Sequence, residues 1–154
     1  MQISKWQVMR KVLFKIPFFP LKVFHYAVLS PWRTYDGKRI IINFGPINWI
    51  FNPTARITFD FYDETAEKQK IWEPARGIHW KPDVDPSWII YDRLDFVQTH
   101  ILMNLRYCYP WKSPYIKPLI LEGELYDLDE NNCEHFTSYA VYGNRFSSQT
   151  DVFT

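Results

Sequence analysis

The chain has 154 residues, 47% of them apolar and 23% charged, so it is long enough to bury one core and too apolar for a disordered segment. Aromatic residues make up 19% of the sequence, well above ordinary usage, and most of them must be buried in the fold or in an interface. The formal net charge of +1 argues against a strongly basic nucleic-acid-binding domain.

The first predicted element is an amphipathic helix. Its apolar residues recur at helical spacing: Ile3, Trp6, Met9, Val12, Leu13 and Ile16. Pro17 ends this helix because an interior proline lacks a donor N–H, and a second apolar run follows from 21 to 29. Turn residues Asp36 and Gly37 close the segment. We therefore predict a basic, apolar N-terminal helical arm over residues 1–38 and a single globular domain over residues 39–154.

The charge of this arm is opposite to that of the rest of the chain. Residues 1–38 carry seven Lys or Arg against the single acid Asp36, whereas the remainder is net acidic. The arm is expected either to pack on its own domain or to bind a groove on another subunit or an anionic membrane. Lysines and prolines interrupt its apolar run, which argues against a signal peptide and a membrane-spanning helix. The predicted location is the cytoplasm or a particle assembled there.

Strands and one helix are predicted in the domain. Residues 39–44 are rich in β-branched side chains and residues 56–62 alternate, which indicates two strands. Apolar residues at spacings of three and four predict a central helix near 92–108. A strand is the alternative there, because a second apolar ridge lies beside the first. Leucines alternating with polar residues over 119–127, and a β-compatible run over 133–142, predict a hairpin.

These elements favour an α+β fold, an antiparallel sheet with the N-terminal helical arm and one central helix. A mostly-β sandwich or barrel is the alternative. Cys108 and Cys133 are expected to be reduced, because two cysteines do not form a disulfide framework in a chain of this size.

One group of residues is typical of acid–base chemistry. Glu122 and Glu124 share a strand face, His135 follows on the strand predicted to pair with it, and His79 lies in a proline-rich loop. A simpler interpretation is that the carboxylates form the solvated side of a half-buried strand. No zinc spacing and no glycine-rich phosphate loop occurs in the sequence, so we predict no cofactor and no metal site.

The preferred function is a non-enzymatic structural or adaptor protein that forms a homo- or hetero-oligomer with other protein subunits, with a viral or phage particle as one setting. Peripheral membrane contact is a further option, and the balanced charge disfavours nucleic acid. The alternative is a small enzyme or ligand-binding protein with an acidic and histidine-containing pocket. The predicted partner contacts are Trp6, Met9, Lys11, Leu13, Lys15, Phe18, Phe19, Trp72, Trp80 and Trp88.

Overall fold

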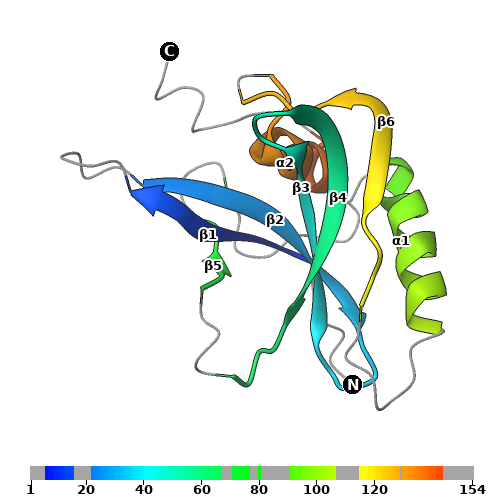
Figure 1. Cartoon of the computed structure of the whole chain (residues 1–154). Helices are drawn as coiled ribbons and strands as arrows, with labels where there is room; N and C mark the ends of the chain where they lie inside the picture. The colour runs from blue at the N-terminus through cyan, green and yellow to red at the C-terminus, as the bar shows by residue number, and fades with distance from the viewer. Residues whose placement is uncertain are drawn as a thin grey trace.

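The computed structural model describes residues 6–15, 22–66, 71–76, 80, 91–106, 115–128 and 130–143. In this part the chain forms one open antiparallel sheet of six strands and two helices (Figure 1). The elements are β1 (Gln7–Lys15), β2 (Lys22–Arg33), β3 (Arg39–Asn48), β4 (Asn52–Tyr62), β5 (Glu73–Pro74), α1 (Tyr91–Arg106), β6 (Leu119–Leu125) and α2 (Cys133–Tyr142). Their order across the sheet is β5-β1-β2-β3-β4-β6.

The predicted α+β fold with an N-terminal helical arm is wrong: the described chain is mostly antiparallel sheet with two short helices. The described residues of the predicted arm form β1 and β2, which pair with each other, and β2 pairs in turn with β3. The physical reason is burial on both faces at the start of β1. Val8 packs in the core on one face, whereas Met9 is buried in a second cluster on the other. A strand buried on both sides shows no alternation of apolar and polar residues. The spacing of three from Trp6 to Met9 to Val12 then imitates a helix.

The central helix predicted near 92–108 is confirmed by α1, and the strands predicted at 39–44 and 56–62 lie within β3 and β4. The stripe formed by Leu94, Val97 and Ile101 is fully buried. The alternative of a sandwich or barrel is wrong, since the strands belong to one open sheet.

The strand and hairpin predicted over 133–142 are also wrong, because this segment is the helix α2. Asn132 is its N-cap: the side chain of Asn132 accepts the backbone N–H of His135, and the ring Nδ1 of His135 accepts the backbone N–H of Asn132. Gly143 ends the helix in the left-handed conformation, with φ 77°. These local caps outweigh a composition that also suits a strand.

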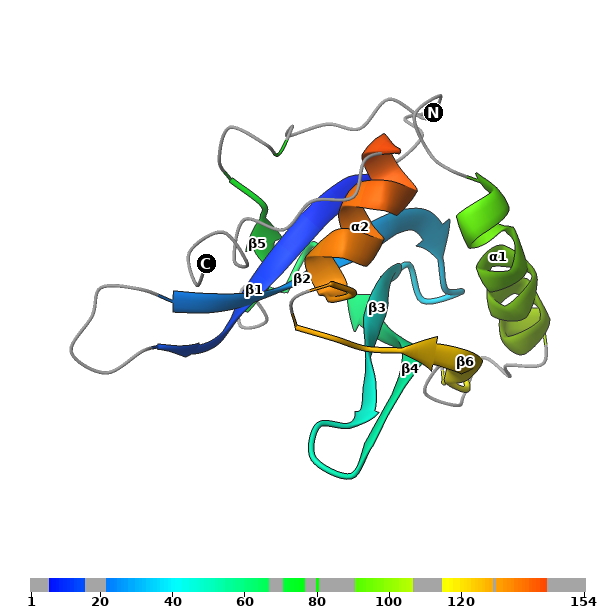
Figure 2. The same ribbon diagram turned by 90° about the horizontal axis from the view of Figure 1, so that it is seen from above.

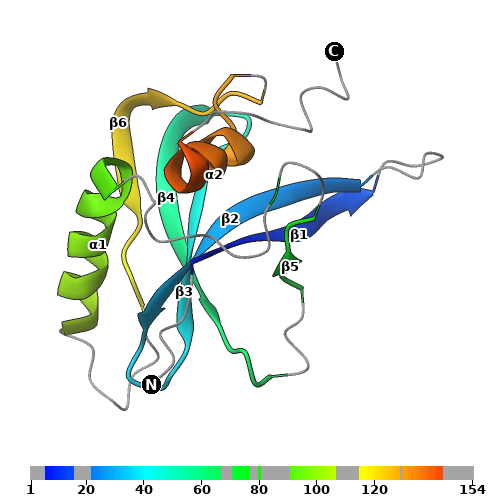
Figure 3. The ribbon, with the colours of Figure 1, turned by 180° about the vertical axis from the view of Figure 1, so that it is seen from behind.

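The two faces of the sheet are covered differently. Both helices contribute to the main core on one face, and Figures 2 and 3 show α2 lying across the sheet and α1 beside β6. The other face carries a smaller buried cluster of Met9, Ala27, Leu29, Ile41 and Trp72. Neither described helix has the length and apolar character needed to cross a membrane.

Candidate functional site

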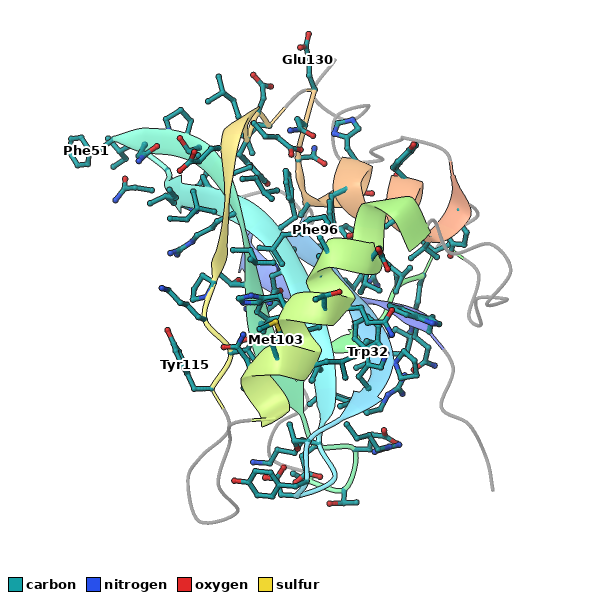
Figure 4. All side chains as sticks on the ribbon, turned by 90° about the vertical axis from the view of Figure 1, so that its right-hand side faces the viewer. Trp32, Phe51, Phe96, Met103, Tyr115 and Glu130 are labelled. Carbon is teal, nitrogen blue, oxygen red and sulfur yellow. The ribbon has the colours of Figure 1, made fainter. Side chains whose placement is uncertain are left out.

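The turn between β3 and β4 displays three consecutive large apolar side chains. Trp49 is 60% exposed, Ile50 81% and Phe51 84%. The side-chain oxygen of Asn48 accepts the backbone N–H groups of Ile50 and Phe51 at 2.9 and 3.0 Å, so these groups are satisfied within the turn. Figure 4 shows Phe51 at the far end of this hairpin, pointing away from the body of the protein. An ordered turn therefore holds these side chains in solvent.

Further exposed apolar side chains lie at the same end of the molecule, where β6 ends beside β4. Leu125 pairs with Thr54, and the ring of Tyr126 contacts that of Trp49 edge-on with centroids 5.1 Å apart. We call this surface the apolar tip; it consists of Trp49, Ile50, Phe51, Leu125 and Leu128. Patches of this kind mark contact sites more often than isolated exposed residues do.

Acidic side chains surround the β6 side of the apolar tip. Glu122, Asp127 and Glu130 are exposed, and Glu124 is half-buried, with its Oε1 accepting from the side chain of Asn131 at 3.4 Å. Glu130 lies at the same end of the molecule as Phe51 in Figure 4. The rim of the tip is therefore negative on this side.

The residues predicted for acid–base chemistry do not form a shared pocket in the described part of the chain. Glu122 and Glu124 lie on β6, whereas His135 belongs to α2 rather than to a paired strand. The ring of His135 serves the capping box of α2. His79 lies outside the described residues.

Most predicted partner contacts that the structure describes are interior. Trp6, Met9, Trp72 and Trp80 are buried, and Trp80 stacks on Tyr26 with ring centroids 5.0 Å apart. Lys11 is half-buried and its Nζ lies 4.8 Å from the centre of the Trp72 ring. The predicted residues outside the described side chains are Leu13, Lys15, Phe18, Phe19 and Trp88.

Sequence reasoning missed the apolar tip because residues 47–51 are too short a run to assign. The available signal was the pair of asparagines, Asn48 and Asn52, that bracket three apolar residues. Asparagine at these places is turn chemistry, and large apolar residues inside a turn have no core to enter.

A polar groove of about 330 Å³ lies where side chains of β1 and β2 meet the β3–β4 hairpin. We call it the sheet groove; it is lined by Lys11, His25, Asn43, Phe44, Gly45, Pro46, Trp49, Arg56, Thr58, Asp60 and Tyr126. Four different strands, the turn between β3 and β4 and the segment after β6 contribute these residues, so their proximity depends on the pairing of the sheet.

A chain of hydrogen bonds orients the histidine of this groove. The amide Nδ2 of Asn43 donates to the Oδ2 of Asp60 at 2.9 Å and to the backbone oxygen of Thr58 at 3.4 Å. The Oδ1 of Asn43 therefore faces His25 and accepts from its Nε2 at 2.8 Å. Burial lowers the pKa of His25 below its ordinary value, although the bond to Asn43 opposes this shift. His25 is thus held as a neutral imidazole near neutral pH, with Nδ1 as its titrating atom.

Acidification is expected to destabilise the fold through His25. Because burial lowers the pKa of His25 below 6.5 in the folded protein, the unfolded chain binds more protons below that pH. Lys11 opposes protonation and Asp60 favours it, as secondary contributions to the pKa. The free energy of unfolding should fall as the pH is lowered through 6.5 toward the depressed pKa of the folded state, and urea denaturation at each pH measures it.

The variant His25→Gln removes the titrating group, so it should lose less stability over this pH range than the native chain does. His135→Gln is the matched control, since glutamine also completes a capping box. A native-like pH dependence in His25→Gln would show that another group governs acid sensitivity.

Within the described residues, no three His, Cys, Asp or Glu side chains cluster in a way that could hold a metal ion. Comparisons with models of known protein families, with curated proteins and with solved structures found no match for this chain, so its functional site rests on its own geometry.

Proposed function

We propose that this chain is a non-enzymatic adaptor or structural protein that binds another protein subunit through the apolar tip. The observation that carries the proposal is the exposure of Ile50 and Phe51, 81% and 84%, at the end of a hairpin whose turn is internally hydrogen-bonded. The location predicted from the sequence, the cytoplasm or a particle assembled there, belongs to the same proposal.

The free energy gained by burying apolar surface supports a protein contact at the apolar tip. Each Å² of apolar surface removed from water contributes about 25 cal/mol, so burial of the tip in a partner is favourable. Tryptophan is among the residues most enriched where binding energy concentrates, and Trp49 is supported from below by Tyr126. In the isolated chain, little of the side-chain surface of Ile50 and Phe51 is buried.

The charge around the apolar tip favours a protein over a membrane. The carboxylates of Glu122, Glu124, Asp127 and Glu130 would be repelled by the negative surface of an anionic bilayer. They complement a partner whose apolar pocket is edged by Lys or Arg. The proposed partner is therefore a protein with a basic rim around an apolar pocket, either a second copy or another subunit.

Site-specific photo-cross-linking tests this contact. A benzophenone side chain at position 51 should cross-link one discrete protein in the native cells or another copy of the purified chain. The matched control is position 115, because Tyr115 is 69% exposed but lies away from the tip in Figure 4. With the identified partner, Phe51→Ser should weaken binding by about tenfold or more, whereas Tyr115→Ser should not.

Salt gives a second readout of the acidic rim. Association should be slower at high salt and in a variant that replaces Glu122 and Glu130 with glutamine. Equal cross-linking at positions 51 and 115, or an unchanged affinity in Phe51→Ser, would contradict the proposal.

A further inference from the structure

The lining of the sheet groove includes two cations, Lys11 of β1 and Arg56 of β4, together with Gly45 of β3. Lys11 pairs with His25 between β1 and β2, and Gly45 pairs with Arg56 between β3 and β4. Between β2 and β3 the last pairing on this side is Val28 with Ile42, and beyond it the side chains of His25 and Asn43 connect the two strands by a hydrogen bond of 2.8 Å. Lys11 and Arg56 line the same groove, so both cations are available to one ligand bound in it.

Gly45 leaves a gap in the lining of the sheet groove. A Cβ added at Gly45 would meet no atom within 4 Å, and the φ of Gly45 is not in the left-handed region. The backbone therefore does not require glycine here, and what glycine supplies is open space. A glycine inside a strand often marks a place where a ligand approaches the backbone closely.

The charges around the gap suit an anion. Arg56 forms no ion pair within the described part of the chain, and Lys11 is held over the ring of Trp72. The single carboxylate of the groove, Asp60, already accepts a hydrogen bond from Asn43. With His25 neutral, the groove carries one more positive than negative charge.

An aromatic wall closes one side of the groove. Trp49 and Tyr126 line it, and their rings meet edge-on at an interplanar angle of 77°. Exposed indole rings offer a surface on which a flat ring can stack. The volume of about 330 Å³ lies at the lower end of the range for small-molecule sites.

We infer that the sheet groove binds a small anionic molecule with a planar ring, whose anionic group lies over Gly45 between Lys11 and Arg56 and whose ring contacts Trp49. This binding goes beyond the protein contact proposed above; the two sites share Trp49, whereas Gly45 and Arg56 belong to the groove alone. A single-stranded nucleic acid would need a longer basic track than two cations provide.

Titration calorimetry with phenyl phosphate, inorganic phosphate and phenol at neutral pH tests the inference. Phenyl phosphate should bind the full chain more tightly than either fragment by about tenfold or more, because only it satisfies both parts of the groove. The amide NMR signals of Gly45 and Arg56 should shift on binding.

Three variants separate the groove from the rest of the surface. Gly45→Val fills the gap and should abolish binding, while Gly45→Ala should weaken it. Arg56→Gln should weaken phenyl phosphate binding by about tenfold or more, since a charge-assisted hydrogen bond is lost. Lys117→Gln is the control, because Lys117 is an exposed cation outside the groove.

The variants leave Ile50 and Phe51 in place, so partner cross-linking at position 51 should persist in Gly45→Val and distinguishes this site from the protein contact. No binding of phenyl phosphate at millimolar concentration, equal binding of phenol, or unchanged affinity in both Gly45→Val and Arg56→Gln would overturn the inference. Binding of an oligonucleotide without binding of phenyl phosphate would also overturn it.

Discussion

Replacing Phe136 with alanine is expected to lower the free energy of unfolding by about 3–5 kcal/mol, since this is the usual cost of truncating a buried phenylalanine. Phe136 is 1% exposed, and its side chain packs α2 against the sheet. Its ring stacks on that of Phe44 in β3 with centroids 4.9 Å apart and an interplanar angle of 4°. The substitution removes both the buried area and this stacking contact.

Urea denaturation followed by circular dichroism measures the change. Phe96→Ala is the matched control, because Phe96 is an exposed phenylalanine on α1 (Figure 4) and should change the free energy of unfolding far less. If Phe136→Ala does not fold, Phe136→Leu should give a smaller, measurable loss. Equal losses in Phe136→Ala and Phe96→Ala would contradict the packing of α2 on the sheet.

The elements that could be predicted from the sequence are those whose local pattern matches their burial. In α1, Leu94, Val97 and Ile101 recur at spacings of three and four because one helix face enters the core. In β4, Ile57 is fully buried, while Thr58 lies on the opposite face beside the sheet groove. An element that buries one face and leaves the other less buried shows a regular spacing of apolar residues in its sequence.

The N-terminal strands and α2 could not be predicted in this way, for two different reasons. β1 buries the neighbouring residues Val8 and Met9 on opposite faces, and its pairing with β2 and β5 depends on contacts that no local window contains. In α2, the apolar pattern suits either structure, and the deciding signals are single residues at its ends, Asn132 and Gly143.

The two candidate sites also differ in whether the sequence could have predicted them. The apolar tip is a continuous run, so turn chemistry around Asn48 could have indicated it. The sheet groove combines Lys11, His25, Gly45 and Arg56 from four strands. Its residues meet only through the register of the sheet, and none of them forms a recognisable motif along the chain.

The attachment of α1 to the core provides the second large stability effect. Ile101→Ala is expected to lower the free energy of unfolding by about 2–5 kcal/mol, the range for truncation of a buried isoleucine. Ile101 is fully buried in the main core, together with Leu94 and Val97 on the same helix face. Thermal and urea unfolding of the purified variant measure the loss.

The neighbouring residue provides the control for this experiment. Leu102 is exposed on the same turn of α1, so Leu102→Ala should change the free energy of unfolding by a small fraction of the loss in Ile101→Ala. Both substitutions raise or keep the helix propensity, so a difference between them reports packing rather than helix formation. Similar losses at both positions would mean that α1 is not held on the sheet by its Leu94, Val97 and Ile101 face.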